Sequence, residues 1–495
     1  MKPLTVVAQY IPGPLFQKTL RAFAESGLVE DVVVLCQEPV RSEIPKCRFL
    51  VAGPLATQET LVTLLNVLGT AYLLIMPGFA QVSIEERSLE KILAKAESAR
   101  TGIVYSDFYD KNDETKILHP LADYQLGSVR DDFNFGAMML YSVSAIRKAF
   151  DIYGPIPSVQ YAGLYDIRLK VSIDHDIYHL QEPLYSVVER GALSGGESMF
   201  SYVDPRNVAA QKEMEVVFTD YLKNIGAYLA AYSLREATVT SDVFPVEASV
   251  IIPVRNRVNT IAEAIKSALS QEADFPFNII VVDNRSTDGT TTVVSDLADR
   301  YSTLNHIIPV RTDLGIGGCW NEALFSRGCG RYAVQLDSDD LYSTPQTLQR
   351  IVNMLRRDNY AMVIGSYTIV DFDLNEIPPG LIDHREWTDE NGHNNALRIN
   401  GLGAPRAFDT STMRGIRFLN VSYGEDYAAA LQISREYRIG RIFESLYLCR
   451  RWPGNTDASL SIEETNKNDA FKDKIRTVEI ITRQEINNHR LKSSA

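Results

Sequence analysis

Short apolar runs alternate with amphipathic segments in the second half of the chain, and this alternation restricts the fold more than any other feature. The run EASVIIPVRNR starts at Glu247, and residues 259–271 follow it with their apolar side chains on one helical face. The next run, FNIIVVD, ends in Asp283 and leads through NRSTDGT into another helix. Strands and helices in this order predict a parallel sheet in an α/β domain. Ligands of such sheets bind at the carboxyl ends of the strands, where Asp283 lies.

Three aspartates, Asp337, Asp339 and Asp340, follow a further apolar run in the segment QLDSDDL. Carboxylates this close repel one another, so folding alone gives little reason to cluster them. Hard divalent cations such as Mn2+ and Mg2+ prefer oxygen ligands, and a nucleotide diphosphate could share such a site. A solvated acidic turn would be the better explanation of an isolated cluster. Here the cluster follows a nucleotide-binding signature in the upstream strands, which favours the metal site.

The first half of the chain repeats this unit in a weaker form, at a nearly constant offset of about 260 residues. Four segments match in the same order: 69–83 with 330–345, 101–110 with 361–373, 163–172 with 423–434 and 182–190 with 444–452. One match could arise by chance between two α/β domains, whereas four in the same order favour duplication. Residues 76–79, MPGF, replace the DSDD cluster in the first copy. We therefore expect the first copy to keep the framework without the metal site.

The predicted fold class is α/β, with two tandem domains built on mostly parallel central sheets and with connecting and C-terminal helices. Residues 1–204 are predicted to form the degenerate, non-catalytic copy, and residues 205–246 a helical linker. Residues 247–460 are predicted to form the catalytic domain, and residues 461–495 a C-terminal helical segment.

Charge, cysteine content and hydropathy indicate which kinds of molecule the protein binds and in which cellular compartment it lies. Among 495 residues, 63 acidic side chains outnumber 50 basic ones, and the net charge of −13 argues against nucleic-acid binding. The five cysteines are scattered and never spaced CxxC, which fits a reducing compartment and neither a disulfide framework nor a zinc site. No apolar run reaches the roughly eighteen residues of a membrane helix, and the N-terminal run is too short for a signal peptide. We expect a cytoplasmic protein, free or peripheral to the inner membrane face.

Four ordered motifs between about Glu247 and Asp457 make the second half resemble a family 2 glycosyltransferase of the GT-A fold. SVIIPVRNR resembles the opening strand that surrounds the nucleotide, and Asp283 in VVDNRSTDGT resembles the carboxylate that bonds the base. LDSDDLYSTP resembles the DxD segment of the family, and GEDY resembles the later motif that supplies the general base. The resemblance implies two tandem GT-A domains, of which the first is degenerate.

The resemblance also implies a metal-dependent enzyme that moves a sugar, with inversion, from a nucleotide-diphosphate donor to a hydroxyl acceptor. A UDP-sugar is the expected donor, and the expected acceptor is a glycan or a lipid-linked glycan. Asp339 and Asp340 would coordinate Mn2+ or Mg2+, which would neutralise the charge of the leaving diphosphate. The residues implied for nucleotide-sugar binding are Pro253, Arg255, Asp283, Asn321, Asp337 and Asp339. A homo-oligomer is compatible with these features.

General-base catalysis is assigned to Asp426 in GEDY, because inversion requires a base on the face opposite the departing phosphate. The alternative is that Glu425 and Asp426 only favour a helix N-terminus electrostatically. Acceptor recognition is less well encoded, and we assign it to Glu425, Arg406 and Trp387. The last two lie in a polar, glycine-containing segment, 384–408, of the kind that often carries function.

Three departures from the family pattern affect these assignments. Trp320 precedes Asn321 where the family usually has an Arg-Asn pair. No histidine occurs at 450–459, where many members complete the metal site, so the coordination sphere would use Asn455 or water, or be weaker. Leu448 replaces the glutamine of the QxxRW pattern of processive synthases, which predicts one transfer per encounter.

A protein of a different class, which binds nucleotide or carbohydrate without catalysis, would also carry two such copies if both had lost activity. The intact DSDD and GEDY segments favour the enzyme. A sugar-nucleotide nucleotidyltransferase would require a glycine-rich phosphate loop with a lysine near the opening strand, and PVRNRVNT has neither.

Overall fold

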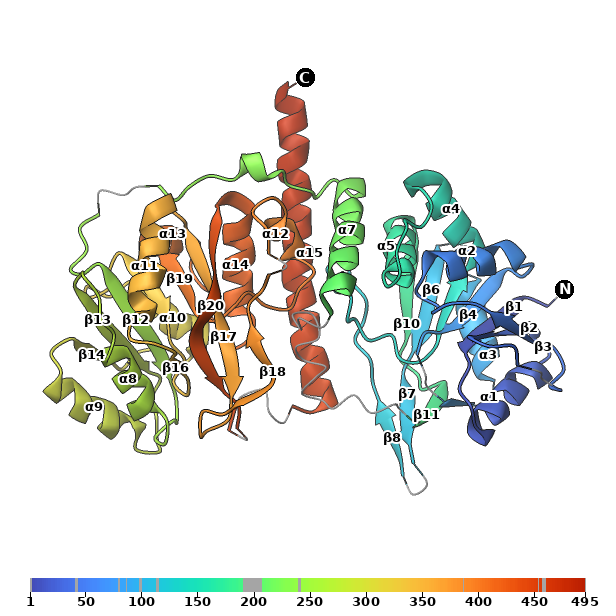
Figure 1. Cartoon of the computed structure of the whole chain (residues 1–495), viewed down its shortest axis with the longest axis horizontal. Coiled ribbons are helices and arrows are strands. Elements are labelled where there is room, and N and C mark those ends of the chain that lie inside the picture. Colours follow the sequence, from blue (N-terminus) through green and yellow to red (C-terminus); the bar gives the residue numbers. More distant parts are fainter. Residues whose placement is uncertain are drawn as a thin grey trace. The chain divides into compact units, whose positions relative to one another are not determined.

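A computed structural model describes residues 2–494 except 41–42, 79–80, 86, 98–99, 113–114, 190–206, 239–241, 386, 453 and 456–459 (Figure 1). The chain divides into two compact units that do not follow chain order. The first unit consists of Met1–Gly195, Ala209–Tyr228 and Leu460–Ile480, and the second of Gly196–Val208, Leu229–Ser459 and Ile481–Ala495.

The second unit is built on a mixed nine-stranded sheet. Its strands are β12 (Ala248–Val254), β13 (Phe277–Asp283), β14 (Leu304–Ile307), β15 (Tyr332–Gln335), β16 (Leu341–Tyr342), β17 (Met362–Val370), β18 (Glu376–Ile382), β19 (Arg406–Asp409) and β20 (Ile439–Arg450). They run in the order β14-β13-β12-β15-β19-β17-β20-β16, with β18 paired to β17. The first four are parallel, β19 is antiparallel to both of its neighbours, and β20 is parallel to β17.

Seven α-helices lie wholly within the part of this unit that the structure describes. They are α8 (Ile261–Leu269), α9 (Thr290–Arg300), α10 (Ile316–Leu324), α11 (Thr347–Asp358), α12 (Gly392–Asn395), α13 (Thr410–Ile416) and α14 (Glu425–Glu436). Five of them, α8 to α11 and α13, pack against the sheet. The face predicted for 259–271 is confirmed, since α8 buries Ile261, Ala264, Ile265 and Ala268. Full burial of an aliphatic side chain of isoleucine size contributes about 1.5–3 kcal/mol, so these contacts hold α8 on the sheet.

The first unit contains a seven-stranded sheet and a separate four-stranded sheet. Its strands are β1 (Leu4–Gln9), β2 (Val29–Cys36), β3 (Cys47–Val51), β4 (Tyr72–Met76), β5 (Gln81–Ile84), β6 (Thr101–Ser106), β7 (Phe108–Lys111), β8 (Lys116–His119), β9 (Met139–Ser142), β10 (Asp176–Leu180) and β11 (Tyr185–Glu189). Its helices are α1 (Pro14–Glu25), α2 (Gln58–Val67), α3 (Ser88–Ala96), α4 (Val143–Tyr153), α5 (Gly163–Asp174) and α7 (Val208–Asn224).

The larger sheet of the first unit has the same topology as seven strands of the second. Its order, β3-β2-β1-β4-β9-β6-β10, corresponds to β14-β13-β12-β15-β19-β17-β20. The directions also agree, because β9 is antiparallel to β4 and β6 while β10 is parallel to β6. The duplication stays a prediction, and this shared topology supports it.

The C-terminal segment forms one helix, α15 (Ile462–Ser494), which belongs to both units. Its residues up to Ile480 group with the first unit and those from Ile481 onward with the second. Within the predicted linker 205–246, α7 groups almost entirely with the first unit. The units therefore differ from the predicted division, and the predicted boundary at 204 lies outside the described residues.

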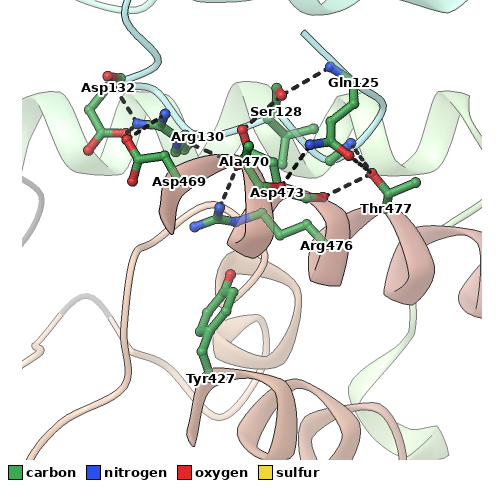
Figure 2. A network of polar contacts seen from close by, with 12 residues as sticks. Gln125, Ser128, Arg130, Asp132, Tyr427, Asp469, Ala470, Asp473, Arg476 and Thr477 are labelled. Carbon is green, nitrogen blue, oxygen red and sulfur yellow. Dashed lines mark hydrogen bonds and ion pairs between the residues drawn. The ribbon is translucent and has the colours of Figure 1, made fainter. Parts of the chain in front are cut away.

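A buried polar network holds the first turns of α15 to the segment 125–132 of the first unit (Figure 2). Arg130 pairs with Asp132 and Asp469 at 3.0 Å and with Asp473 at 3.5 Å. Burial opposes the charge of Arg130, but these carboxylates outweigh it and raise the pKa of the guanidinium. At Gly127, a Cβ atom would come within 1.9 Å of the Asp473 carbonyl oxygen, so the two backbones can approach only at a glycine.

Candidate active site

Eight of the eleven predicted site residues line one cavity of about 530 Å³ in the second unit, a volume typical of small-molecule sites. They are Pro253, Arg255, Asp337, Asp339, Asp340, Arg406, Glu425 and Asp426. The loops after β12 and β15 and the start of α14 carry most of them, so the cavity opens at the carboxyl ends of parallel strands, as predicted.

The carboxylates after β15 are largely withdrawn from solvent, and Asp340 is buried. Asp337 accepts from Gln335 Nε2 at 3.0 and 3.1 Å, and Asp340 Oδ1 accepts from the backbone NH of Arg450 at 2.8 Å. Burial first, and then the neighbouring carboxylates, raise the pKa of Asp337 and of Asp340. A bound cation would relieve this repulsion, and an oxygen-rich cluster is chemically suited to Mn2+ or Mg2+.

Asp339 is the carboxylate best placed to hold such a cation. Its side chain is 14% exposed and lies 3.7 Å from Arg257 Nε. Its Oδ2 accepts from Trp452 Nε1 at 3.3 Å and from Asn455 Nδ2 at 3.4 Å. Among the described residues, no group of three or more His, Cys, Asp or Glu side chains forms a complete metal site. Diphosphate and water would therefore have to supply most of the ligands.

Asp283 lies outside the cavity lining, although it was predicted to bind the nucleotide base. Its carboxylate is fully buried and accepts from the backbone NH of Ser286 at 2.9 Å and from the Thr291 hydroxyl. Burial raises the pKa of Asp283, but these donors and His306 outweigh it and hold the pKa well below its usual range. The next residue, Asn284, lines the cavity instead, because successive side chains of an extended chain point in opposite directions.

Asn321, predicted to bind the nucleotide sugar, has its side-chain amide bonded to the protein backbone. The Asn321 amide bonds the backbone of Phe418 twice, with Nδ2 donating at 2.9 Å and Oδ1 accepting at 3.0 Å. Asn321 is not part of the cavity lining, whereas Trp320 is, with its ring against Phe408 and Phe418. The Asn321 amide thus positions the segment around Phe418, which forms one wall of the cavity.

Trp387, predicted to contact the acceptor, does not line the cavity that contains eight of the other predicted site residues. It lines a separate small cavity with Tyr360, His393 and Tyr437. Its ring covers Gly392, where a Cβ atom would approach the ring to 2.5 Å. These contacts describe a packed aromatic side chain rather than a surface open to a sugar.

The two acidic residues at the start of α14 have different surroundings. Asp426 Oδ2 lies 2.6 Å from Arg406 Nη2, and the aspartate side chain is 31% exposed. Glu425 is 8% exposed, and its Oε2 has no hydrogen-bond partner among the described residues. Burial, followed by repulsion from Asp426, raises the pKa of Glu425 to about 8. The glutamate is therefore mostly protonated at neutral pH, while its neighbour is paired with a cation.

Sequence reasoning missed several residues of the lining, among them Arg257, Asn284, Gln335, Phe408 and Phe418. Arg257 and Gln335 each stand two residues from a predicted site residue, so local spacing could have indicated them. Phe408 likewise stands two residues from Arg406, whereas Phe418 lacks any local signal and reaches the cavity through long-range packing alone.

Comparisons with known proteins find a family model and several glycosyltransferases that are similar to this chain. The family model "Glycosyl transferase family 2" matches residues 249–421. The chain is similar to the putative glycosyltransferase EpsE of Bacillus subtilis, with 34% identity over 122 residues, 25% of this chain and 43% of that protein. It is also similar to the succinoglycan biosynthesis protein ExoO of Rhizobium meliloti, with 29% identity over 123 residues, 25% of this chain and 34% of that protein. The chain thus spans less than half the length of these relatives.

Among solved structures, residues 1–349 of S. aureus TarS in complex with UDP-GlcNAc are 21% identical, with a TM-score of 0.37, over 48% of this chain and 72% of that one. The predicted resemblance to glycosyltransferase family 2 is confirmed for residues 249–421, the part of the second unit that the family model matches. The α/β fold class is confirmed by the strands and helices of the structure. Among the described residues, no helix has the length and apolar character needed to cross a membrane.

Proposed function

We propose that the second unit transfers a sugar from a nucleotide-diphosphate donor to a hydroxyl of a glycan or lipid-linked glycan, with inversion and one transfer per encounter. One observation carries this proposal. A single cavity joins the carboxylate cluster after β15, the arginines after β12 and Asp426 at the start of α14. These groups provide in one place what binding and departure of a diphosphate and activation of a hydroxyl require.

Donor binding is assigned to the side of the cavity formed by the ends of β12 and β15. Arg255, Arg257 and Arg451 line it and can form charge-assisted hydrogen bonds with phosphate oxygens. Asp339 would hold a divalent cation, Mn2+ or Mg2+, which supplies Lewis-acid stabilisation of the leaving diphosphate. Asp337 is assigned to the ribose of the donor, and Asn284, in place of Asp283, to the base.

Asp426 is assigned as the base. In the transfer, the acceptor oxygen forms a bond to the anomeric carbon while the bond from that carbon to the diphosphate breaks. The hydroxyl proton passes to the Asp426 carboxylate, and nucleoside diphosphate leaves on the opposite face. Glu425 is the poorer base, because its raised pKa keeps a proton on the carboxyl at neutral pH. It can instead donate a hydrogen bond to a sugar hydroxyl.

A screen of nucleotide sugars for slow, metal-dependent hydrolysis tests the proposal without knowledge of the acceptor. We expect release of nucleoside diphosphate from at least one donor with Mn2+ or Mg2+ and none with EDTA. Asp339→Asn serves as the control that separates this activity from a contaminating hydrolase. Nucleotide binding without turnover of any donor would instead identify a non-catalytic binding protein.

A further inference from the structure

Four polar side chains form a continuous chain of contacts along the cavity of the second unit. Gln335 Nε2 donates to both carboxylate oxygens of Asp337, at 3.0 and 3.1 Å. Gln335 Oε1 accepts from the Arg406 backbone NH at 3.2 Å and from its Nη1 at 3.0 Å. The other end of the guanidinium, Nη2, lies 2.6 Å from Asp426 Oδ2. The chain therefore runs from the carboxylate cluster to the proposed base.

The fold places the two middle residues side by side. Gln335 ends β15 and Arg406 begins β19, and these strands are antiparallel neighbours whose register pairs Val334 with Ala407. Arg406 is anchored a third time, since its Nε donates to the Leu402 carbonyl at 2.6 Å. All three guanidinium nitrogens thus have protein partners, and the side chain is only 13% exposed.

We infer that Gln335 and Arg406 are positioning residues, which hold the Asp426 carboxylate at a set place relative to Asp337, and that Arg406 is not an acceptor ligand. This inference rests on the proposed function. The side-chain amide of Gln335 can make both contacts, because its oxygen accepts from the Arg406 guanidinium and its NH2 group donates to the Asp337 carboxylate. The guanidinium suits its place because a rigid fork can bridge two acceptors, which a lysine ammonium cannot do in the same geometry.

The chain of contacts from Asp337 to Asp426 joins a residue proposed to bind the donor to a residue proposed to activate the acceptor. Asp337 stands with the donor-binding carboxylates, whereas Asp426 is the proposed base for the acceptor. A displacement of about 1 Å in a reacting group can reduce a rate about 100-fold. Arg406 on β19 and Glu425 on α14 face Asp426, and Asp337 after β15 is linked to it through Gln335 and Arg406.

The test compares Arg406→Lys, Gln335→Leu and the double variant with the wild type. We expect Arg406→Lys to lower kcat about 100-fold and Gln335→Leu about tenfold, with KM for the acceptor unchanged in both. The double variant should be no slower than Arg406→Lys, because Gln335 acts through Arg406.

A matched control is Arg356→Lys, which changes an arginine that pairs with Glu247 at 2.8 Å and does not line the cavity. It should leave kcat and both KM values unchanged. Either of two kinetic results would overturn the inference: a raised KM for the acceptor with kcat kept, which makes Arg406 an acceptor ligand, or additive losses in the double variant.

Crystal structures of the two single variants provide a readout that does not depend on activity. We expect the Asp426 carboxylate to rotate away from its position in the wild type. An unchanged Asp426 in both variants would overturn the inference. A rotated Asp426 in a protein that turns over no nucleotide sugar would overturn the proposed function while the positioning role stands.

Discussion

The two units share the order and direction of seven strands, but the second has an acidic segment, DSDD, after its central strand β15, where the sequence of the first has MPGF at the end of β4. In the first unit, β4 ends in Met76 and is followed by the sequence PGF. In the second unit, the matching strand β15 ends in Gln335, and DSDD follows one residue later. Buried apolar strands therefore maintain the framework in both units, and a few residues just beyond the strands distinguish them.

The acidic residue at the start of the matched helices shows the same difference. In α14, Asp426 pairs with Arg406 from a different strand. In α5, Asp166 pairs with Lys170 of the same helix at 2.9 Å, and both side chains are buried. Burial raises the pKa of Asp166 to about 6, although Lys170 opposes the shift. Asp166 is thus part of a core ion pair rather than the helix cap that its position alone would indicate.

The largest expected difference between the units is in metal-nucleotide binding. With Mn2+, we expect titration calorimetry of the full chain with UDP to give one site per chain, and no measurable binding with EDTA. The carboxylate cluster would repel a diphosphate in the absence of the cation. Two sites per chain would break the comparison, because the first unit would then bind nucleotide too. Equal affinity in EDTA would remove the metal role of Asp339.

A matched pair of substitutions tests the two helix starts. Asp426→Asn should reduce transfer by about 100- to 10,000-fold, the range of general-base catalysis, with nucleotide affinity nearly intact. Asp166→Asn should leave kcat and KM of the folded enzyme unchanged and lower the stability of the first unit, because Lys170 would lose its charged partner. Near-wild-type transfer by Asp426→Asn would show that the base lies elsewhere.

Substitution of Arg130 in the network of Figure 2 tests whether the first unit contributes to stability without contributing to activity. Arg130→Met should cost about 3 kcal/mol of unfolding free energy, the lower end for a broken buried ion pair, because Arg476 and Ser128 still bond Asp473. Denaturant unfolding measures this loss, and donor hydrolysis by the folded variant should be unchanged.

The control for this loss is Arg48→Met, which breaks a more exposed pair with Asp31 in the same unit. It should cost less than about 1 kcal/mol. Equal losses in the two variants would show that the buried network contributes no more than a surface ion pair.

The last expected effect is a pH dependence of stability in the second unit. The pKa of Glu425 is raised to about 8 in the folded chain, so the folded state binds more protons than the unfolded state between its ordinary value and 8. Stability from this group is present below the ordinary pKa and is lost as pH rises toward 8. Glu425→Gln should therefore raise Tm more at pH 8.5 than at pH 5. A difference in Tm that is independent of pH would contradict the buried, protonated state.

The sequence predicted the framework and the chemistry of the cluster better than the directions of individual side chains. The apolar face of α8 and the gathering of Asp337, Asp339 and Asp426 around one cavity followed from periodicity and motif order. Asp283, predicted to bind the nucleotide, lies outside the cavity lining, whereas the next residue, Asn284, is part of it. A pattern locates the end of a strand more sharply than the side that its last residue faces.

What the sequence by itself determined is which segments become strands and helices and where acidic residues follow them, since both depend on local periodicity and residue type. Only the tertiary structure decided which acidic residue is paired, buried or exposed. Arg406, Gln335 and Asp426 lie far apart in the chain, and the pairing of β15 with β19 brings the first two together. The protonation of Glu425 likewise depends on desolvation and on the charge of Asp426, and desolvation is a property of the packed interior.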